Sequence, residues 1–374
     1  MAKINVRSPY YVYFAANKLD SAEISIWIYT GTQTASRPVT PTYALNSFAI
    51  QNAVNFEIAE LVKDYMFYNA ADYETEIVWV DYQIRKVVGN VSGLEPLSQN
   101  KGFYGFGYFE DGVNPQNDLG LLQSNNTIVK LDDAPVYLPV DTSKVREVSF
   151  YFEGEKVYEK NFLSGDFNSE NQIQYVTNTV TPADEFEDRV VDDGGIFEGS
   201  LCLNEFLDDV TLFPVDTIYI YDIFNNDNGQ IVKVKSIDEC KYEPLKVSFI
   251  NKFGALQDVW FFKRSNKDLS TTKESFKRNT LVTNNYQLDK HQQKNLFKKG
   301  NEKMTLNTGY YPEEYNEVFR QMQLSEDAWI EINNEVLPIN ISDSSFSFKT
   351  SLNDKLINYT IKIDFAFDTI NNIR

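Results

Sequence analysis

Histidine and cysteine are nearly missing from this sequence of 374 residues, which contains one histidine, His291, and two cysteines, Cys202 and Cys240. Zinc sites of the Cys/His class need three or four such ligands at short spacings, so the sequence excludes them. Acid–base catalysis by histidine would depend on His291 alone. That residue stands among lysine and glutamine residues, so we expect it in a solvated loop. Neither a Gly-x-Ser-x-Gly nucleophile elbow nor a phosphate-binding P-loop motif occurs.

Long apolar segments are missing as well. No run of about 18 apolar residues occurs, so we expect no membrane-spanning helix and no membrane insertion. The opening residues, MAKINVRSPYYVYFAAN, lack the apolar centre of a secretory signal, which favours a reducing compartment. In such a compartment we expect Cys202 and Cys240 to be buried packing residues.

Carboxylates, by contrast, are abundant, with 54 Asp and Glu residues. Two of them could support glycoside hydrolysis, but the separation that defines the mechanism is a property of the tertiary structure. The doublets Asp192-Asp193 and Asp208-Asp209 lack the spacing of an EF-hand calcium loop, so we expect surface clusters there. The sequence therefore predicts no catalytic residue, no metal ligand and no cofactor, and leaves glycan cleavage by carboxylates as the open enzymatic route.

The charge is unevenly distributed along the chain. The net charge is −19, yet residues 246–303 contain 13 Lys/Arg and 5 Asp/Glu, which gives +8 there and −27 for the remainder. Residues 184–216 hold eleven Asp/Glu against the single Arg189. Such basic and acidic segments can attract each other between copies of the chain; two solvated loops that never meet are the equally weighted alternative. The negative net charge of the chain disfavours direct nucleic-acid binding.

Aromatic residues make up 14% of the chain, with 27 Phe and 23 Tyr, and this composition favours β structure. We expect a mainly β, multi-domain fold with a boundary near residue 140. The predicted domains are a β-sandwich at 1–140, a central β domain with an acidic insertion at 141–278, and a helix with β-strands at 279–374.

The first predicted domain has short alternating segments at the spacing of an immunoglobulin- or fibronectin-like sandwich. The expected strands are 4–15, 23–30, 43–50, 54–58, 75–88 and 102–109, with a short helix at 59–67. Within the last strand, Gly102, Gly105 and Gly107 lack the order of a dinucleotide-binding motif. Glycines between aromatic residues favour a packed strand or a bulge instead.

Turn signals divide the later segments. Residues 145–152 and 156–162 predict a hairpin turned at 153–155, and 217–224 with 230–236 predict a second one turned by Asn228-Gly229. A long polar loop is expected at 167–197. A helix is expected to begin at Pro312, because Tyr315, Val318, Phe319 and Met322 lie on one helical face. The last expected strands are 328–332, 335–341, 345–350 and 359–367.

The most distinctive stretch is a predicted hairpin of two apolar strands, 246–250 and 259–262. Gly254 stands in its link and can adopt a positive φ without steric cost. Aromatic and basic residues interleave directly after the link, from Trp260 to Arg264. Such interleaving could stack on nucleic acid or sugar, but core aromatic residues at a charged strand end are the favoured interpretation.

Residues 239–242 and 249–263, ECKY and FINKFGALQDVWFFK, resemble a segment of virion structural proteins of tailed bacteriophages. These are phages of Bacteroidetes, including crAss-like phages, and marine phages. Weaker similarity occurs at 7–12 with 57–65, and at 308–311 with 359–365. The resemblance implies a component of a particle and transfers no catalytic residue.

From the resemblance and the charge pattern we expect a non-enzymatic subunit that forms an oligomeric ring in a phage tail, neck or baseplate. Its partners would be copies of itself and other virion tail or neck proteins, and it would be assembled in the host bacterial cytoplasm. The candidate assembly residues are Asn251, Lys252, Phe253, Gly254, Trp260, Lys263 and Arg264.

Two alternatives stay open. One is a phage tail protein that binds or cleaves carbohydrate, which exposed Trp or Tyr residues lining a groove with two carboxylates would favour. The other is a soluble bacterial β-sandwich adhesin, against which the missing signal segment argues.

Overall fold

The computed structural model describes residues 2–31, 33, 35–116, 120–162, 173–180, 211–222, 225–279, 281–282, 285–286, 288–343, 347 and 356–369. The chain falls into two compact units. The first unit comprises Met1–Asp238, Ser248–Val259 and Glu317–Ser325. The second unit comprises Glu239–Val247, Trp260–Asn316 and Glu326–Arg374. The three domain ranges expected from the sequence stay predictions.

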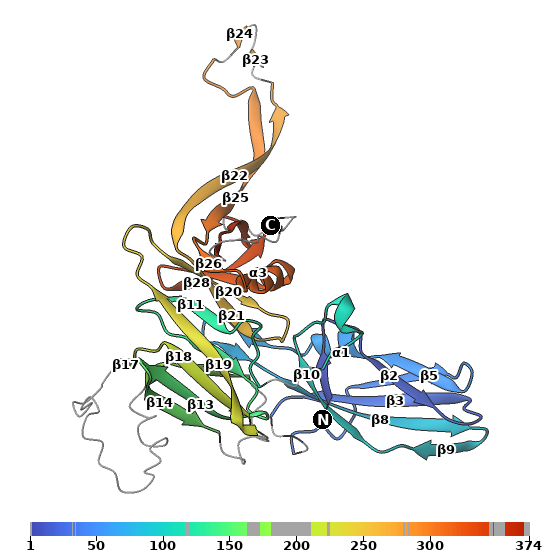
Figure 1. Cartoon of the computed structure of the whole chain (residues 1–374). Coiled ribbons are helices and arrows are strands. Elements are labelled where there is room, and N and C mark those ends of the chain that lie inside the picture. Colours follow the sequence, from blue (N-terminus) through green and yellow to red (C-terminus); the bar gives the residue numbers. More distant parts are fainter. Residues whose placement is uncertain are drawn as a thin grey trace. The chain divides into compact units, whose positions relative to one another are not determined.

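The N-terminal part of the first unit is a β-sandwich (Figure 1). Its strands are β1 (Ala2–Asn5), β2 (Tyr11–Ala15), β3 (Ser21–Tyr29), β4 (Tyr43–Phe48), β5 (Ala53–Glu57), β8 (Val78–Val88), β9 (Val91–Leu94) and β10 (Ser98–Phe103). One sheet has the order β1-β10-β8-β3-β4, with β9 beside β8, and β2 pairs with β5 in the other. Strands β10, β8 and β3 correspond to strands G, F and C of an immunoglobulin-like sandwich, and β2 and β5 to strands B and E.

Short elements complete the sandwich: α1 (Ala59–Lys63), β6 (Tyr68–Asn69), β7 (Glu74–Thr75) and the 3₁₀ turn η1 (Phe109–Asp111). Every second side chain of β3 points to the same face of the sheet, and on one face Ala22, Ile24, Ile26 and Ile28 are all buried. Tyr29, on the opposite face, is buried too, and its hydroxyl donates to the fully buried carboxylate of Asp81 at 3.1 Å.

The central part of the first unit is a five-stranded sheet in the order β11-β19-β18-β13-β14. Its strands are β11 (Thr127–Leu131), β13 (Val145–Phe152), β14 (Glu155–Asn161), β18 (Thr217–Asp222) and β19 (Asn225–Ile237). Two-stranded sheets accompany it: β12 (Tyr137–Val140) with β15 (Gln174–Thr177), and β16 (Thr179–Val180) with β17 (Thr211–Leu212). Phe150, Val148 and Ile218 lie fully buried in its core.

A further sheet has the order β21-β20-β27-β28-β30-β25-β22. Its strands are β20 (Leu245–Ile250), β21 (Leu256–Phe261), β22 (Lys263–Lys277), β25 (Gln293–Asn307), β27 (Ala328–Ile332), β28 (Glu335–Ile341) and β30 (Thr360–Phe365). The remaining elements are β23 (Leu281–Val282), β24 (Asn285–Tyr286), β26 (Tyr311–Pro312), β29 (Leu356–Ile357) and the helix α3 (Tyr315–Leu324).

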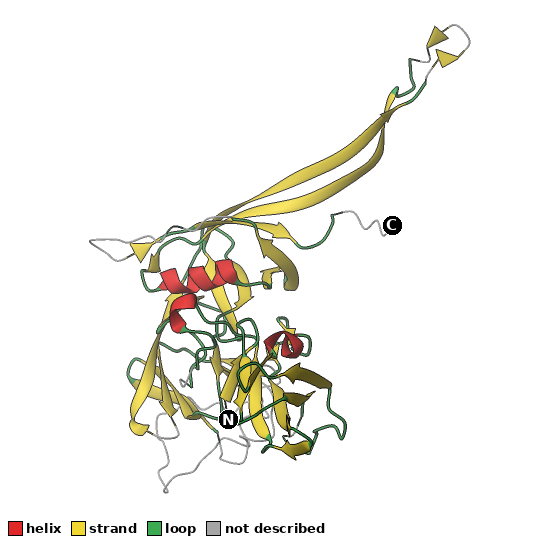
Figure 2. Ribbon diagram, turned by 90° about the vertical axis from the view of Figure 1, so that its right-hand side faces the viewer, coloured by secondary structure: helices red, strands yellow, loops and turns green. Residues whose placement is uncertain are grey.

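The second unit carries a long two-stranded ribbon made by β22 and β25 (Figures 1 and 2). Strand β30 pairs with β25 at residues 303–307 alone. Beyond that point β25 pairs with β22, from Leu269 opposite Glu302 to Lys277 opposite Gln293. We call residues 269–277 and 293–302 the arm. Its strands were not predicted, because polar residues occur on both of its faces and leave no alternation.

The mainly β fold is confirmed, and several elements are confirmed within a residue or two. The hairpin of β13 and β14 turns at Glu153 and Gly154, whose φ angles are 53° and 87°. The four residues of the predicted helical face, Tyr315, Val318, Phe319 and Met322, are all buried in α3. His291 is exposed, as expected. Gly254 has a φ of 80° in the link between β20 and β21.

Several expectations are wrong. The strand expected at 102–109 is β10, which spans Ser98–Phe103 instead. Asn228-Gly229 does not form the second turn, because β19 already begins at Asn225 and Gln230 pairs with Ile220 inside the ladder. Pro312 lies in β26 rather than in the first turn of α3, which begins at Tyr315. Cys240 is exposed rather than buried. The long loop expected at 167–197 is also wrong in part, because β15 and β16 lie within it at 174–177 and 179–180. The expectations for 167–172, 181–197, Cys202, Asp192-Asp193 and Asp208-Asp209 lie outside the described residues, as does nearly all of 345–350.

The five-stranded sheet provides a test of the assigned core. Phe150→Ala removes a fully buried ring from β13, and we expect it to lower the free energy of unfolding by about 3–5 kcal/mol. The control is Phe152→Ala, two residues along the same strand and partly exposed, where a loss of about 1 kcal/mol or less is expected. Urea titration followed by circular dichroism measures both values, and equal losses would contradict the assigned packing.

Candidate functional site

The link between β20 and β21 is built around the buried side chain of Asn251. Its amide nitrogen donates to the carbonyl of Leu122 at 2.8 Å and to Oε1 of Gln257 at 3.1 Å. Its amide oxygen accepts from the backbone N–H of Phe253 at 2.9 Å and of Ala255 at 3.2 Å. Every donor and acceptor position of the side chain is thereby used. Asn251 therefore fixes the shape of the link from inside the first unit.

Two glycines allow the backbone of the β20–β21 link to pack closely against the backbone that follows β10. A Cβ atom on Gly254 would lie 2.8 Å from the backbone nitrogen of Tyr104, and one on Gly105 would lie 2.6 Å from the carbonyl oxygen of Lys252. The backbone N–H of Phe106 donates to that same carbonyl at 2.9 Å. Side chains at either glycine would separate the two backbones and break this hydrogen bond.

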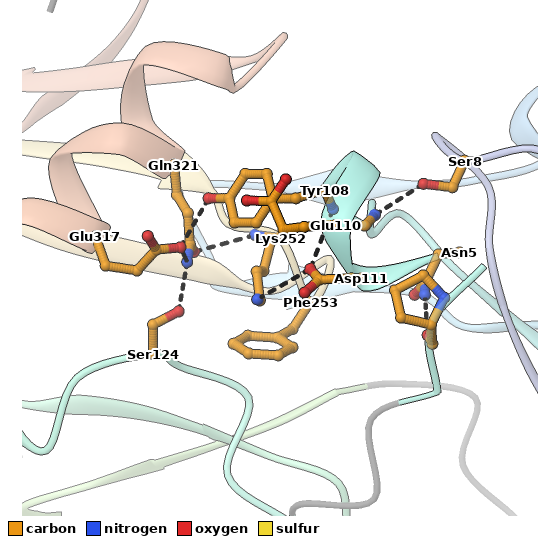
Figure 3. A network of polar contacts seen from close by, with 12 residues as sticks. Asn5, Ser8, Tyr108, Glu110, Asp111, Ser124, Lys252, Phe253, Glu317 and Gln321 are labelled. Atoms are coloured by element: carbon orange, nitrogen blue, oxygen red, sulfur yellow. Dashed lines mark hydrogen bonds and ion pairs between the residues drawn. The ribbon is translucent and has the colours of Figure 1, made fainter. Parts of the chain in front are cut away.

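Lys252 joins a network of polar and aromatic side chains, shown in Figure 3. Its ammonium group lies 3.7 Å from the carboxylate of Asp111 and 5.0 Å from the ring centroid of Tyr108. Its backbone N–H donates to Oε1 of Gln321 at 3.2 Å. The Nε2 amide of Gln321 in turn donates to Glu317 at 2.8 Å and to the hydroxyl of Ser124.

The ring of Tyr108 is the centre of this network. The guanidinium of Arg320 lies 3.6 Å from its centroid and forms an ion pair with Glu110 at 3.3 Å. The hydroxyl of Tyr108 donates to Glu317 at 2.7 Å. Burial, followed by this bond to a carboxylate, raises the pKa of Tyr108 above its ordinary value of 10.0. The phenol is therefore held neutral as a donor and as a surface for the two cations.

An open pocket of about 320 Å³ lies beside Lys252. It is lined by Asn5, Phe106, Asp111, Pro115, Gln116, Lys252 and Phe253. A second pocket of about 490 Å³, in the central sheet of the first unit, includes Lys130, Asp132 and Asp216 in its lining. Neither lining combines exposed Trp or Tyr with two carboxylates, the arrangement that would favour the carbohydrate alternative.

A tyrosine cluster also contacts the hairpin of β20 and β21. The hydroxyl of Tyr73 donates to Asp258 at 2.5 Å, and Ser248 donates to the other oxygen of that carboxylate at 2.6 Å. The ring of Tyr73 stacks on Tyr137 with centroids 3.6 Å apart and contacts Tyr175 edge-on. Segments far apart in the sequence are thus locked together inside the first unit.

The remaining predicted assembly residues belong to the second unit. The backbone N–H and C=O of Trp260 both bond to the buried hydroxyl of Tyr311, at 3.1 and 2.7 Å. Lys263 forms an ion pair with Glu239 at 2.5 Å, and the hydrogen bond from Lys263 lowers the pKa of Glu239. Arg264 is exposed.

The seven predicted residues therefore form two groups, Asn251–Gly254 in the first unit and Trp260, Lys263 and Arg264 in the second. Asn251 and Gly254 are internal, so an influence on assembly would act through the shape of the link. The sequence did not point to Tyr108, Glu317 and Gln321, because they carry no local motif and Tyr108 lies 209 residues before Glu317 in the chain.

Comparison with known proteins finds no matching family model and no matching curated protein. Among the described residues, no helix is long and apolar enough to cross a membrane. Within the same part of the chain, no group of three or more His, Cys, Asp or Glu side chains is placed to hold a metal ion.

Gly254→Val tests the close backbone contact. The substitution meets a positive φ, which costs about 1–3 kcal/mol, and a collision with Tyr104, which adds about 1–3 kcal/mol. Gly89→Val is the matched control, because Gly89 has a φ of 59° with nothing near its Cβ position. We expect Gly254→Val to lower the midpoint of thermal unfolding much more than Gly89→Val, and similar midpoints would contradict the contact.

Tyr73→Phe tests the tyrosine cluster through the pH dependence of the free energy of unfolding. Burial, followed by the charge of Asp258, raises the pKa of Tyr73 far above 10.0, so the folded state favours the neutral phenol. This stabilisation is complete below about pH 10 and is lost as the pH rises above that value. We expect Tyr73→Phe to cost about 1.5–3 kcal/mol at neutral pH and to flatten the decline of stability between about pH 10 and 12.

The control for this experiment is Tyr13→Phe, at an exposed position of β2, which we expect to leave stability unchanged. Urea titrations at several pH values give the free energy of unfolding for each variant. An alkaline decline in Tyr73→Phe as steep as in the wild type would show that Tyr73 does not carry the effect.

Proposed function

We propose that this chain is a non-enzymatic structural subunit of a tailed-phage particle, where many copies form a ring in the tail, neck or baseplate. The observation that carries the proposal is the arm, a two-stranded ribbon with exposed side chains on both faces. Two-stranded hairpins in water are marginally stable unless another surface packs on them. In an assembly, a neighbouring subunit can pack against the arm and stabilise it.

The compact parts of the chain support the same role. The buried Asn251 amide and the Tyr73–Asp258 bond join segments of the first unit that are far apart in the sequence. A ring subunit needs such fixed internal contacts, because heterologous contacts between copies must repeat at one angle to close. The resemblance of residues 239–263 to phage virion proteins supplies the kind of particle.

The proposal is tested first on particles. We expect mass spectrometry of gradient-purified virions to detect the chain in many copies, and a reconstruction of the particle to place it in the tail, neck or baseplate. Neighbouring genes for a portal, capsid or tail sheath protein would agree with this. Turnover of host polysaccharide that one Asp or Glu substitution abolishes without unfolding would instead favour the carbohydrate alternative.

The purified chain provides a second test. We expect sedimentation velocity to show a discrete species of several copies at low ionic strength, which dissociates as salt is added. The reason is that screening shortens the range of charge attraction from about 10 Å at 0.1 M to about 3 Å at 1 M ionic strength. A chain that stays monomeric at every concentration and is absent from particles would contradict the proposed function.

A further inference from the structure

The arm carries an excess of positive charge that its own strands do not balance. Five lysines and two glutamates lie on it, which gives +3: Lys273, Lys277, Lys294, Lys298, Lys299, Glu274 and Glu302. Glu302 is engaged by Lys267 at 2.5 Å, and Lys299 lies 3.9 Å from Asp368. Among the ion pairs of the described residues, none includes Lys273, Lys277, Lys294 or Lys298.

The register of the arm places like charges directly opposite each other. Lys273 pairs with Lys298 across the ribbon, and the next pair along the ladder puts Lys299 opposite Thr272. Like charges in facing positions of an antiparallel pair are destabilising. Both lysines are exposed, so each must be solvated or be met by an anion. This arrangement favours the binding of acidic groups at the arm.

Apolar side chains accompany the lysines. Leu269, Phe276 and Leu296 are 61%, 45% and 58% exposed. Leu296 lies at a bulge, where the register shifts between Glu274 opposite Phe297 and Ser275 opposite Asn295. A bulge leaves its extra residue outside the ladder. The arm therefore offers cationic groups beside exposed apolar ones, the pattern expected for a partner that is acidic and also apolar.

The sequence contains one segment with that chemistry. Residues 184–209 hold ten Asp/Glu and one basic residue, Arg189, together with Phe186, Ile196, Phe197 and Phe206. We infer that the arm of one copy binds residues 184–209 of a second copy. The inference rests on the proposed function, since it supposes that copies of the chain meet. Nucleic acid is a poorer occupant, because the net charge of −19 repels a polyanion from the rest of the molecule.

Charge reversal of full-length chains tests this contact. The arm variant is Lys273→Glu with Lys298→Glu, the acidic-segment variant is Glu187→Lys with Asp188→Lys, and the control is Lys233→Glu with Lys235→Glu. The control positions are exposed residues of β19 and change the net charge by the same amount as the arm variant. Sedimentation velocity at low ionic strength measures self-association, and circular dichroism checks that each chain is folded.

We expect the arm variant and the acidic-segment variant each to weaken self-association by about tenfold or more, and the control to change it less than twofold. An equimolar mixture of the two variants should associate as the wild type does. In the mixture each reversed arm meets a reversed segment, and each native arm meets a native one. Addition of a double-stranded DNA fragment should leave the wild-type assembly unchanged.

Several outcomes would overturn the inference. If the arm variant associates as tightly as the wild type, the arm is not the contact, while the proposed function stands. If the mixture fails to restore association, the occupant is not residues 184–209 of a second copy. Binding of the DNA fragment that the arm variant loses would identify nucleic acid as the occupant. A wild-type chain that never associates and is absent from particles would overturn the proposed function together with this inference.

Discussion

A buried amide is the constraint on which the first unit depends. Asn251 must satisfy two donors and two acceptors away from water, and it does so only when the β20–β21 link, Leu122 and Gln257 are all in place. A buried amide that lost one of these partners would pay about 1–3 kcal/mol. Gly254 makes the arrangement possible, because its missing side chain lets the link lie against the backbone at Tyr104.

The tyrosines extend this constraint with neutral hydroxyls that act as donors. Tyr73 donates to Asp258, and Tyr108 donates to Glu317 while Arg320 lies against its ring. Each carboxylate favours the protonated phenol, and burial acts in the same direction on the pKa of both tyrosines. Such directional contacts between buried polar groups make the local geometry specific as well as stable.

The arm is stabilised differently from the body. The core residues of the five-stranded sheet are fully buried, whereas the arm exposes side chains on both faces and places Lys273 opposite Lys298. Backbone hydrogen bonds of the ladder and the anchoring of β25 to β30 therefore hold it in the free chain. Its unbalanced charge and its exposed apolar groups give a physical reason to look for a partner there.

Aromatic composition determined the mainly β fold. The spacing of apolar side chains determined the strands at 328–332 and 335–341 and the buried face of α3, because burial on one face imposes a period on the sequence. Only the tertiary structure decided that Asn228-Gly229 lies within a strand and that Cys240 is exposed, since strand pairing and packing overrode the local turn and burial preferences. It also decided that the arm is a ribbon and that Tyr108 meets Glu317. Contacts between residues some 200 positions apart leave no periodic signal in the sequence. The strands of the arm leave no such signal either, because neither of their faces is buried.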